Sequence, residues 1–158
     1  MTRPAALGRI ATFFGAIGAS ATPYTAAATE ASWNLTEAQW KSRLSPGVFA
    51  ILRQHATDPP GSSPLDHEKR KGTYSCAGCE LALFSSKTKF ESGTGWPSFY
   101  EPLAHAVATS SDHSYLMERT EVHCLRCGGH LGHLFDDGPK PTGLRYCING
   151  LALNFKPE

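Results

Sequence analysis

The chain has 158 residues and a formal net charge of +1 at neutral pH. This length allows one domain with a core and a short appendage, and the near-neutral charge gives no sign of a nucleic-acid partner. No apolar run is long enough to span a membrane, and we expect a monomer. Frequent glycines and prolines, together with only short helical periods, favour a mainly β domain.

The N-terminal segment, residues 1–29, has the order of a secretory signal. It carries Arg3 and Arg9 and no acid, then an apolar block from Ile10 to Ala19. Ala19-Ser20-Ala21 and Ala26-Ala27-Ala28 both offer small-residue cleavage sites. We therefore predict export, to the periplasm. The alternatives are an organellar transit peptide and, if the segment is not processed, a cytoplasmic protein.

The folded domain is predicted to cover residues 33–158 and to begin with two short helices. Thr36 can cap the first helix while Gln39 reaches back to it, and Ser45-Pro46 has the pattern of a second helix start. Thr57 to Pro64 is predicted to be a linker of Pro, Gly and Ser.

From Gly72 onward the pattern changes to strands separated by turn clusters. The predicted strands are Thr73–Cys76, Lys89–Glu91, Ser114–Val122, Leu131–Phe135, Leu144–Asn149 and Leu151–Phe155.

Four of the five cysteines form two Cys-x-x-Cys pairs, Cys76/Cys79 and Cys124/Cys127. Two such knuckles supply four thiolates in the closed tetrahedral set of a structural zinc. Because 44 residues lie between Cys79 and Cys124, this metal would join distant parts of the chain. We predict one structural zinc ion.

Three other interpretations of the paired cysteines remain open. Each pair could be a redox disulfide, although the chain lacks the βαβ pattern of thioredoxin-like proteins. In an oxidising compartment the four could instead form two ordinary disulfides. A third possibility is a compact site made of Cys124, Cys127, His130 and His133.

The fifth cysteine, Cys147, is the predicted nucleophile. Strand alternation places Arg145, Cys147 and Asn149 on one face. A neighbouring cation is expected to lower the pKa of the thiol and increase its reactive thiolate fraction. The alternative is an inert core cysteine, but polar neighbours on the same face argue against it.

Two further segments contain residues typical of a substrate-binding or catalytic site. Trp96 lies in a turn of glycines and a proline, which suggests an aromatic pocket wall, although a loop tryptophan folded onto the core is equally compatible. His130 and His133 follow the second knuckle within a glycine-rich turn, where a metal would fix their backbone.

Five segments combine these features in order: Lys71–Cys76, Phe90–Phe99, Arg119–Val122, His130–His133 and Arg145–Asn149. Together they resemble the methionine-R-sulfoxide reductases of the B type, over about Leu35 to Phe155. The resemblance implies two antiparallel sheets in a tent-like arrangement, with short N-terminal helices and a structural zinc.

The resemblance also implies roles for individual residues. Cys147 attacks the sulfoxide sulfur and becomes a sulfenic acid. His130, His133 and Asn149 bind and polarise the sulfoxide oxygen, one of them through water, and Arg145 supports the thiolate.

The remaining implied roles concern the substrate methyl group and the metal. Trp96 packs against the methyl group of the substrate. Cys76, Cys79, Cys124 and Cys127 match the zinc ligands of the zinc-containing branch. The implied partners are oxidised methionine in proteins or peptides and a thiol reductant such as thioredoxin.

The chain departs from a common family pattern at Thr94. Many members of the family have a resolving cysteine at this position, and a threonine cannot form a disulfide. Either an external thiol reduces Cys147 directly, or one of the zinc-ligand cysteines is recruited. We expect the external thiol, because recruiting a ligand would dismantle the metal site.

Two alternatives belong to other functional classes. A non-enzymatic binding module of this fold would keep the zinc cysteines but lose Cys147, Arg145 and the two histidines. A thiol peroxidase could use the same activated cysteine.

Overall fold

The structure, a computed structural model, describes residues 33–158. It contains two α-helices, α2 (Glu37–Arg43) and α3 (Pro46–Gln54), and short 3-10 turns at Pro64–His67, Ser86–Thr88, Ser114–Leu116 and Gly150–Ala152. The strands are β1 (Gly72–Cys76), β2 (Ala82–Ser85), β3 (Lys89–Phe90), β4 (Ser98–Phe99), β5 (Val107–Asp112), β6 (Arg119–Cys124), β7 (His130–Phe135), β8 (Arg145–Ile148) and β9 (Leu153–Pro157).

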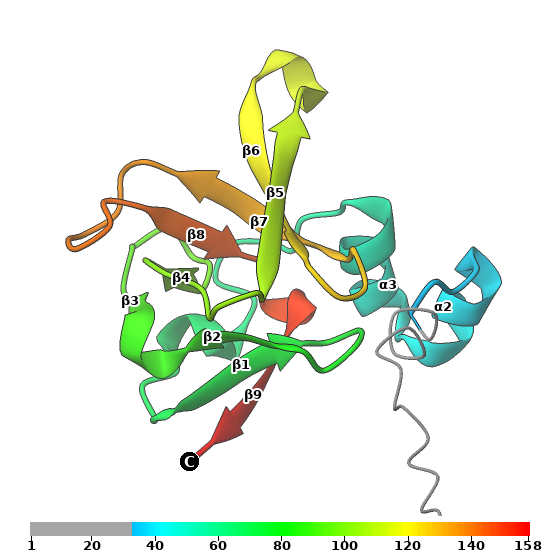
Figure 1. The fold of residues 1–158 in the computed structure, drawn as a ribbon, viewed down its shortest axis with the longest axis horizontal. Helices are drawn as coiled ribbons and strands as arrows, with labels where there is room; N and C mark the ends of the chain where they lie inside the picture. The colour runs from blue at the N-terminus through cyan, green and yellow to red at the C-terminus, as the bar shows by residue number, and fades with distance from the viewer. Residues whose placement is uncertain (1–32) are drawn as a thin grey trace, which may run out of the picture.

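The strands form two antiparallel sheets, as the sequence predicted (Figure 1). One has three strands in the order β2-β1-β9, and the other has six in the order β3-β4-β8-β7-β6-β5. In Figure 1 the two helices lie together at one side of the sheets, and the β5–β6 hairpin extends away from the three-stranded sheet. The mainly β prediction is therefore confirmed.

The two helices begin where the sequence predicts. The Thr36 side chain accepts from the backbone N–H of Gln39, and the Gln39 side chain accepts from the backbone N–H of Thr36. Ser45 caps α3, and Pro46 occupies its first turn, where a missing N–H costs nothing. These local signals are strong because each satisfies backbone donors that a helix start leaves unpaired.

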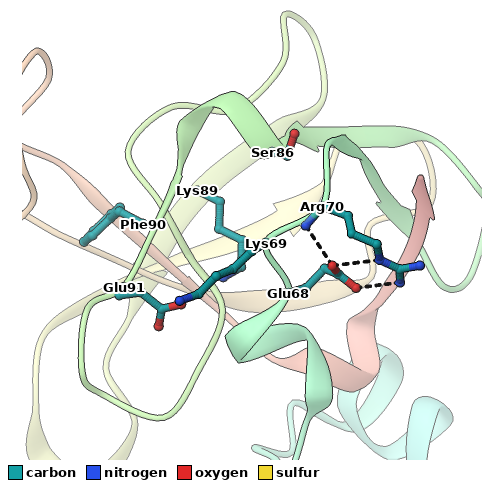
Figure 2. A pocket seen from close by; sticks show the side chains of 7 residues that line it. All are labelled: Glu68, Lys69, Arg70, Ser86, Lys89, Phe90 and Glu91. Atoms are coloured by element: carbon teal, nitrogen blue, oxygen red, sulfur yellow. Dashed lines mark hydrogen bonds and ion pairs between the residues drawn. The ribbon is translucent and has the colours of Figure 1, made fainter. Parts of the chain in front are cut away.

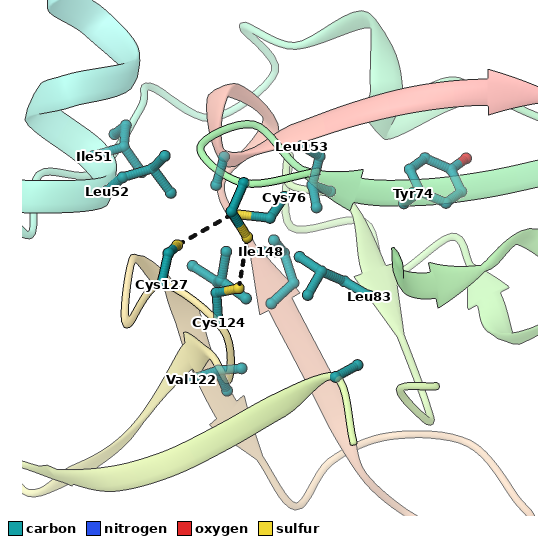
Figure 3. Packing of buried hydrophobic residues seen from close by; sticks show 14 of the residues in the cluster. Ile51, Leu52, Tyr74, Cys76, Leu83, Val122, Cys124, Cys127, Ile148 and Leu153 are labelled. Atoms are coloured by element: carbon teal, nitrogen blue, oxygen red, sulfur yellow. Dashed lines mark hydrogen bonds between the residues drawn. The ribbon is translucent and has the colours of Figure 1, made fainter. Parts of the chain in front are cut away.

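Aromatic side chains join the two sheets through a shared core. The rings of Phe84 on β2 and Phe99 on β4 stack with centroids 4.3 Å apart, and Tyr74 on β1 meets Phe99 edge-on at 4.9 Å. Figure 3 shows the other end of this core, where the cysteines lie between α3 and the strands beside Leu52, Val122 and Ile148. The cysteine cluster is thus continuous with the hydrophobic core.

The strand prediction was wrong in one place and incomplete in three. Ser114–Val122 is not one strand: its first part is a 3-10 turn at the tip of the hairpin, and β6 starts only at Arg119. Three strands, β2, β4 and β5, were missed. β5 has the sequence VATSSD and is largely exposed, so it carries little of the apolar alternation that identifies a strand.

The predicted N-terminal signal lies outside the described residues. Within residues 33–158, none of the helices combines the length and apolar character needed to cross a bilayer.

Candidate functional site

The four paired cysteines converge on one buried point. Cys76 ends β1 and Cys124 ends β6, and the two turns that follow bring in Cys79 and Cys127. The Sγ atoms of Cys76 and Cys127 are 3.7 Å apart, and those of Cys79 and Cys124 are 3.5 Å apart. These distances exceed the S–S bond of a disulfide, about 2.05 Å, so all four cysteines are free.

This sulfur set suits a structural zinc. A tetrahedral site with Zn–S bonds of about 2.3 Å has S···S edges of about 3.8 Å, close to both measured separations. The backbone of Gly128 has a φ of +68°, which the tight turn after Cys127 requires. The compact alternative that included His130 and His133 is wrong, because both histidines bond carboxylates away from the sulfurs.

Cationic side chains support the backbone of the two knuckles. Arg53 on α3 donates from Nη1 to the carbonyl oxygen of Cys127 at 2.9 Å. Arg126 donates from Nη1 to the carbonyl of Cys79 at 3.1 Å, which ties the second knuckle to the first. Positive charge beside a cluster of thiolates is favourable, and these bonds also orient the ligand-bearing turns.

The fifth cysteine lies in a separate cavity on the six-stranded sheet. Cys147 is on β8, where it pairs with Ser98 of β4 on one side and His133 of β7 on the other. The cavity has a volume of about 130 Å³. Its lining residues are Thr57, Trp96, Arg119, Gly132, His133, Phe135, Cys147 and Asn149.

Gly132 allows the nucleophile strand to approach β7. A Cβ on Gly132 would collide with the carbonyl oxygen of Cys147. The position of a Cβ is set by its own backbone, and the carbonyl oxygen belongs to the paired backbone of β8. No side-chain rotation can therefore relieve the clash. A glycine is therefore required for the β7–β8 pairing that holds His133 opposite Cys147.

The Cys147 thiol has a raised pKa, contrary to the sequence prediction. Burial raises the pKa of this thiol, while the charge of Arg145 and hydrogen bonds with Thr94 and Arg145 lower it only in part. The prediction treated the arginine as the dominant influence. In the fold, loss of hydration at the thiolate outweighs it.

Arg145 is itself held by its neighbours. Its Nε and Nη2 donate to the two carboxylate oxygens of Asp137 at 2.8 and 3.0 Å, and its guanidinium lies 4.3 Å from the ring centroid of Phe135. The pairing with Asp137 raises the pKa of Arg145 and lowers that of the Asp137 carboxyl. Part of the arginine's charge is therefore neutralised before it acts on Cys147.

The two histidines occupy different environments. His133 lines the cavity, and its Nε2 lies 2.7 Å from a carboxylate oxygen of Asp112, which also pairs with Arg119 at 2.8 Å. His130 is 1 % exposed and is not among the cavity-lining residues; its Nδ1 lies 2.8 Å from Glu121. Burial lowers the pKa of His130, which favours the neutral imidazole.

Asp58 organises the opposite wall of the cavity. The indole N–H of Trp96 donates to both the carbonyl and the Oδ1 of Asp58, at 3.0 and 2.9 Å. The backbone N–H of Asp58 donates to Oδ1 of Asn149 at 3.1 Å, and the N–H of Leu151 donates to Oδ2 of Asp58 at 3.1 Å. Asp58 is 3 % exposed. The predicted linker is thus part of the site.

Trp96 and Asn149 both line the cavity. The Asn149 side chain donates from Nδ2 to the carbonyl of Leu131 at 3.0 Å, so both ends of its amide are bonded to backbone. Sequence reasoning missed the acidic partners Asp58, Asp112 and Glu121. The sequence did contain a signal for Glu121, because Arg119 and Glu121 are two residues apart in a strand and therefore lie on the same face.

A second cavity near the three-stranded sheet lacks comparable chemistry. Figure 2 shows Glu68 and Arg70 bonded to each other within it, with a shortest separation of 2.7 Å. This exposed pair satisfies its own charges, and none of the predicted site residues lines the cavity.

Comparison with known proteins gives the family. The SelR domain matches residues 44–157. The chain belongs to this family, the B-type methionine sulfoxide reductases. It is 56 % identical over 124 residues to the "Peptide methionine sulfoxide reductase MsrB" of Methanosarcina barkeri, covering 78 % of this chain and 87 % of the relative. The MsrB of Leptospira interrogans is 52 % identical over 126 residues, covering 79 % and 96 %.

A third relative, the MsrB of Agrobacterium fabrum, is 50 % identical over 125 residues, covering 78 % of this chain and 93 % of its own. The resemblance recognised from five motifs is therefore confirmed, and the chain is an oxidoreductase of this family.

The raised pKa of Cys147 predicts slow alkylation at neutral pH. The rate with iodoacetamide should rise with pH through a midpoint above about 8.5, the ordinary thiol value, because the thiolate is the reactive form. Arg145→Met should move the midpoint upward, and Thr94→Val should move it upward by less. Mass spectrometry of the Cys147 peptide measures the rate. A midpoint below 8.5 would contradict the dominance of burial.

Asp58 is predicted to stabilise the fold through its two acceptor oxygens. Asp58→Asn turns an NH2 group toward one of the two donors, so one buried N–H loses its acceptor, at a cost of about 1–3 kcal/mol of unfolding free energy. Asp66→Asn is the matched control, since Asp66 is also buried but its carboxylate has only a 3.7 Å contact with His67. Equal losses in the two variants, measured by denaturant unfolding, would show that Asp58 has no special role.

Proposed function

We propose that this protein reduces the R epimer of methionine sulfoxide in proteins or peptides, with Cys147 as the nucleophile. The observation that carries the proposal is the cavity in which Cys147, Trp96 and His133 face one small volume. A thioether methyl group suits an aromatic wall, and a sulfoxide oxygen needs hydrogen-bond donors. The names of the relatives, which describe them as peptide methionine sulfoxide reductases, support the same reaction.

The proposed reaction has two balanced steps. In the first, the Cys147 sulfur attacks the sulfoxide sulfur, the S–O bond breaks, and the products are methionine and Cys147 sulfenic acid. The oxygen and the thiol proton both end on Cys147. In the second, two external thiols reduce the sulfenic acid, which gives the Cys147 thiol, a disulfide between the two thiols, and water.

The substrate oxygen would lie on the histidine side of the cavity. His133, His130 and Asn149 are proposed to bind and polarise it, with the buried His130 acting through water. Arg145 would stabilise the negative charge on the Cys147 sulfur. Opposite these groups, Trp96 would contact the methyl group, and its indole N–H is already fixed by Asp58.

The fixed placement of the two walls predicts selectivity for one epimer. Purified protein with dithiothreitol should turn over the R sulfoxide and leave the S sulfoxide, because exchanging methyl and oxygen puts each against the wrong wall. Cys147→Ser should fold normally and turn over neither, since a serine hydroxyl is a far weaker nucleophile than a cysteine thiol. Equal rates on both epimers, or faster turnover of hydrogen peroxide than of the R sulfoxide, would overturn the proposal.

We further propose that the four-cysteine cluster holds one structural zinc ion. The donor set and the separations of the sulfurs support it. When bound, zinc supplies folding free energy and no chemistry at Cys147.

Metal analysis tests the zinc proposal. Protein purified without added zinc and dialysed should contain one zinc per chain, and a strong chelator should lower the melting temperature markedly, because metal binding and folding are coupled. A zinc-free, fully active protein with two disulfides in its mass spectrum would contradict it.

The recycling step is proposed to use an external thiol, such as thioredoxin or a small thiol. The Thr94 side chain helps to lower the pKa of the Cys147 thiol, which indicates that residue 94 lies near this sulfur. The other four cysteines are buried together in the cluster. After one turnover without reductant, Cys147 should be trapped by a sulfenic-acid reagent, and mass spectrometry should find no new disulfide.

Thr94→Cys provides the matched variant for this prediction. A thiol at position 94 should form a disulfide with Cys147 after a single turnover, and the sulfenic acid should no longer be trapped. A disulfide in the wild type between Cys147 and any cluster cysteine would contradict the external-thiol cycle.

Export to the periplasm remains our proposal for the location of the protein, and rests on residues 1–29. An exported enzyme would need a thiol donor that is kept reduced outside the cytoplasm. The alternatives are an organelle or, without processing of this segment, the cytoplasm.

A further inference from the structure

Three potential metal ligands lie together behind the cavity, apart from the cysteine cluster. They are His55 at the end of α3, Glu121 on β6 and His130 at the start of β7. One ligand atom from each lies within 4.8 Å of the other two. The three come from separate elements, so the fold itself brings them together.

The separations of the ligand atoms in this triad are close to the edges of a tetrahedral metal site. Oε1 of Glu121 lies 2.8 Å from Nδ1 of His130 and 3.3 Å from Nδ1 of His55. A tetrahedral site with bonds of about 2.0–2.1 Å has ligand edges of about 3.3–3.4 Å. The edge from Glu121 to His55 already fits, and the edge from Glu121 to His130 must lengthen by about 0.5 Å. The third edge, between the two histidines, is at most 4.8 Å, and the exposed His55 side chain can close it by rotation.

The exposure of His55 and the orientation of Glu121 favour metal binding by these three residues over a simple hydrogen bond between Glu121 and His130. The His55 side chain is 64 % exposed, which gives an ion a path from solvent and leaves room for water ligands. The His130 side chain is 2 % exposed, so an ion bound to its Nδ1 would be shielded from solvent on the His130 side. The second carboxylate oxygen of Glu121 accepts from Ser110 Oγ at 2.9 Å, which orients the carboxylate.

We propose that His55, Glu121 and His130 form a binding site for a divalent transition-metal ion of the zinc type. Two imidazoles and one carboxylate are a ligand set that binds zinc and neighbouring ions while leaving positions for water. Hard ions such as Mg²⁺ prefer sites made of oxygen ligands and are not expected here.

Occupation of the site changes the hydrogen bonding of His130. In the metal-free state, Nδ1–H donates to Glu121 and Nε2 is an acceptor. A metal on Nδ1 displaces that proton, and a proton on Nε2 restores the neutral ring, so Nε2 becomes a donor. If His130 acts on the substrate oxygen through water, which is the proposed function, occupation of the site changes the turnover rate, because a donor at Nε2 replaces an acceptor.

Direct binding of zinc is the first test, because it does not depend on activity. Dialysed protein that retains its tightly bound zinc is titrated with Zn²⁺ by calorimetry and by equilibrium dialysis. The wild type should bind one additional ion. His55→Asn should weaken this binding by about tenfold or more, since even outer partners of metal ligands contribute 10–100-fold.

The chain offers a closely matched control for the His55 variant. His105 is also exposed and also has a φ of +56°, a left-handed conformation that asparagine tolerates. His105→Asn should bind the additional zinc like the wild type. Cys147→Ser should also retain it, which separates this site from capture of zinc by the nucleophile.

The outcomes distinguish the proposal from its competitors. No additional zinc in the wild type, unchanged binding in His55→Asn, or loss of binding in Cys147→Ser would each overturn it. In turnover assays, Zn²⁺ should change the rate of the wild type and of His105→Asn equally, and that of His55→Asn only at about tenfold higher zinc. Zinc binding with no change in rate would uphold the site and reject only its effect through His130.

Discussion

The meeting of four cysteine sulfurs is the constraint on which the rest of the structure depends. It joins the turn after β1 to the turn between β6 and β7, and therefore fixes the three-stranded sheet relative to the six-stranded one. Cys76, Cys79 and Cys124 are almost fully buried, in contact with Leu52 and its neighbours in the core. A group of thiolates there would be costly without a cation, so the packing of the core and the proposed zinc depend on each other.

The position of Cys147, the proposed nucleophile, follows from this junction through backbone pairing. Two residues, Gly128 and Gly129, separate Cys127 from the start of β7. β7 pairs with β8 in a register that places His133 opposite Cys147. The pairing is tight enough that Gly132 admits no side chain. The Cys124/Cys127 knuckle therefore positions His133 and Cys147 through a short path of paired main chain, although it lies outside the cavity.

The sequence predicted the parts of the site that local chemistry marks. The cysteine pairs, the histidines beside a knuckle and the strand alternation around Cys147 each have a short-range reason for their spacing. No short-range pattern marks Asp58, because its three hydrogen-bond partners lie 38 or more residues away along the chain and only folding brings them together. The same reason explains β5, whose pairing with β6 depends on partners and not on its own apolar pattern.

The pKa of Cys147 shows why a motif alone can mislead about reactivity. An adjacent arginine suggests a stable thiolate, but here burial raises the pKa of the thiol, and Asp137 neutralises part of the cation.

A raised thiol pKa would slow a nucleophile that attacks an already activated centre. A sulfoxide differs, because its oxygen leaves only when protonated. In the proposed reaction a thiol that keeps its proton until the substrate arrives brings both the sulfur and the proton into a cavity of about 130 Å³. The half-buried Cys147 thiol then suits the proposed substrate, and the proposed role of Arg145 is to stabilise the sulfur anion only as that proton moves to the oxygen.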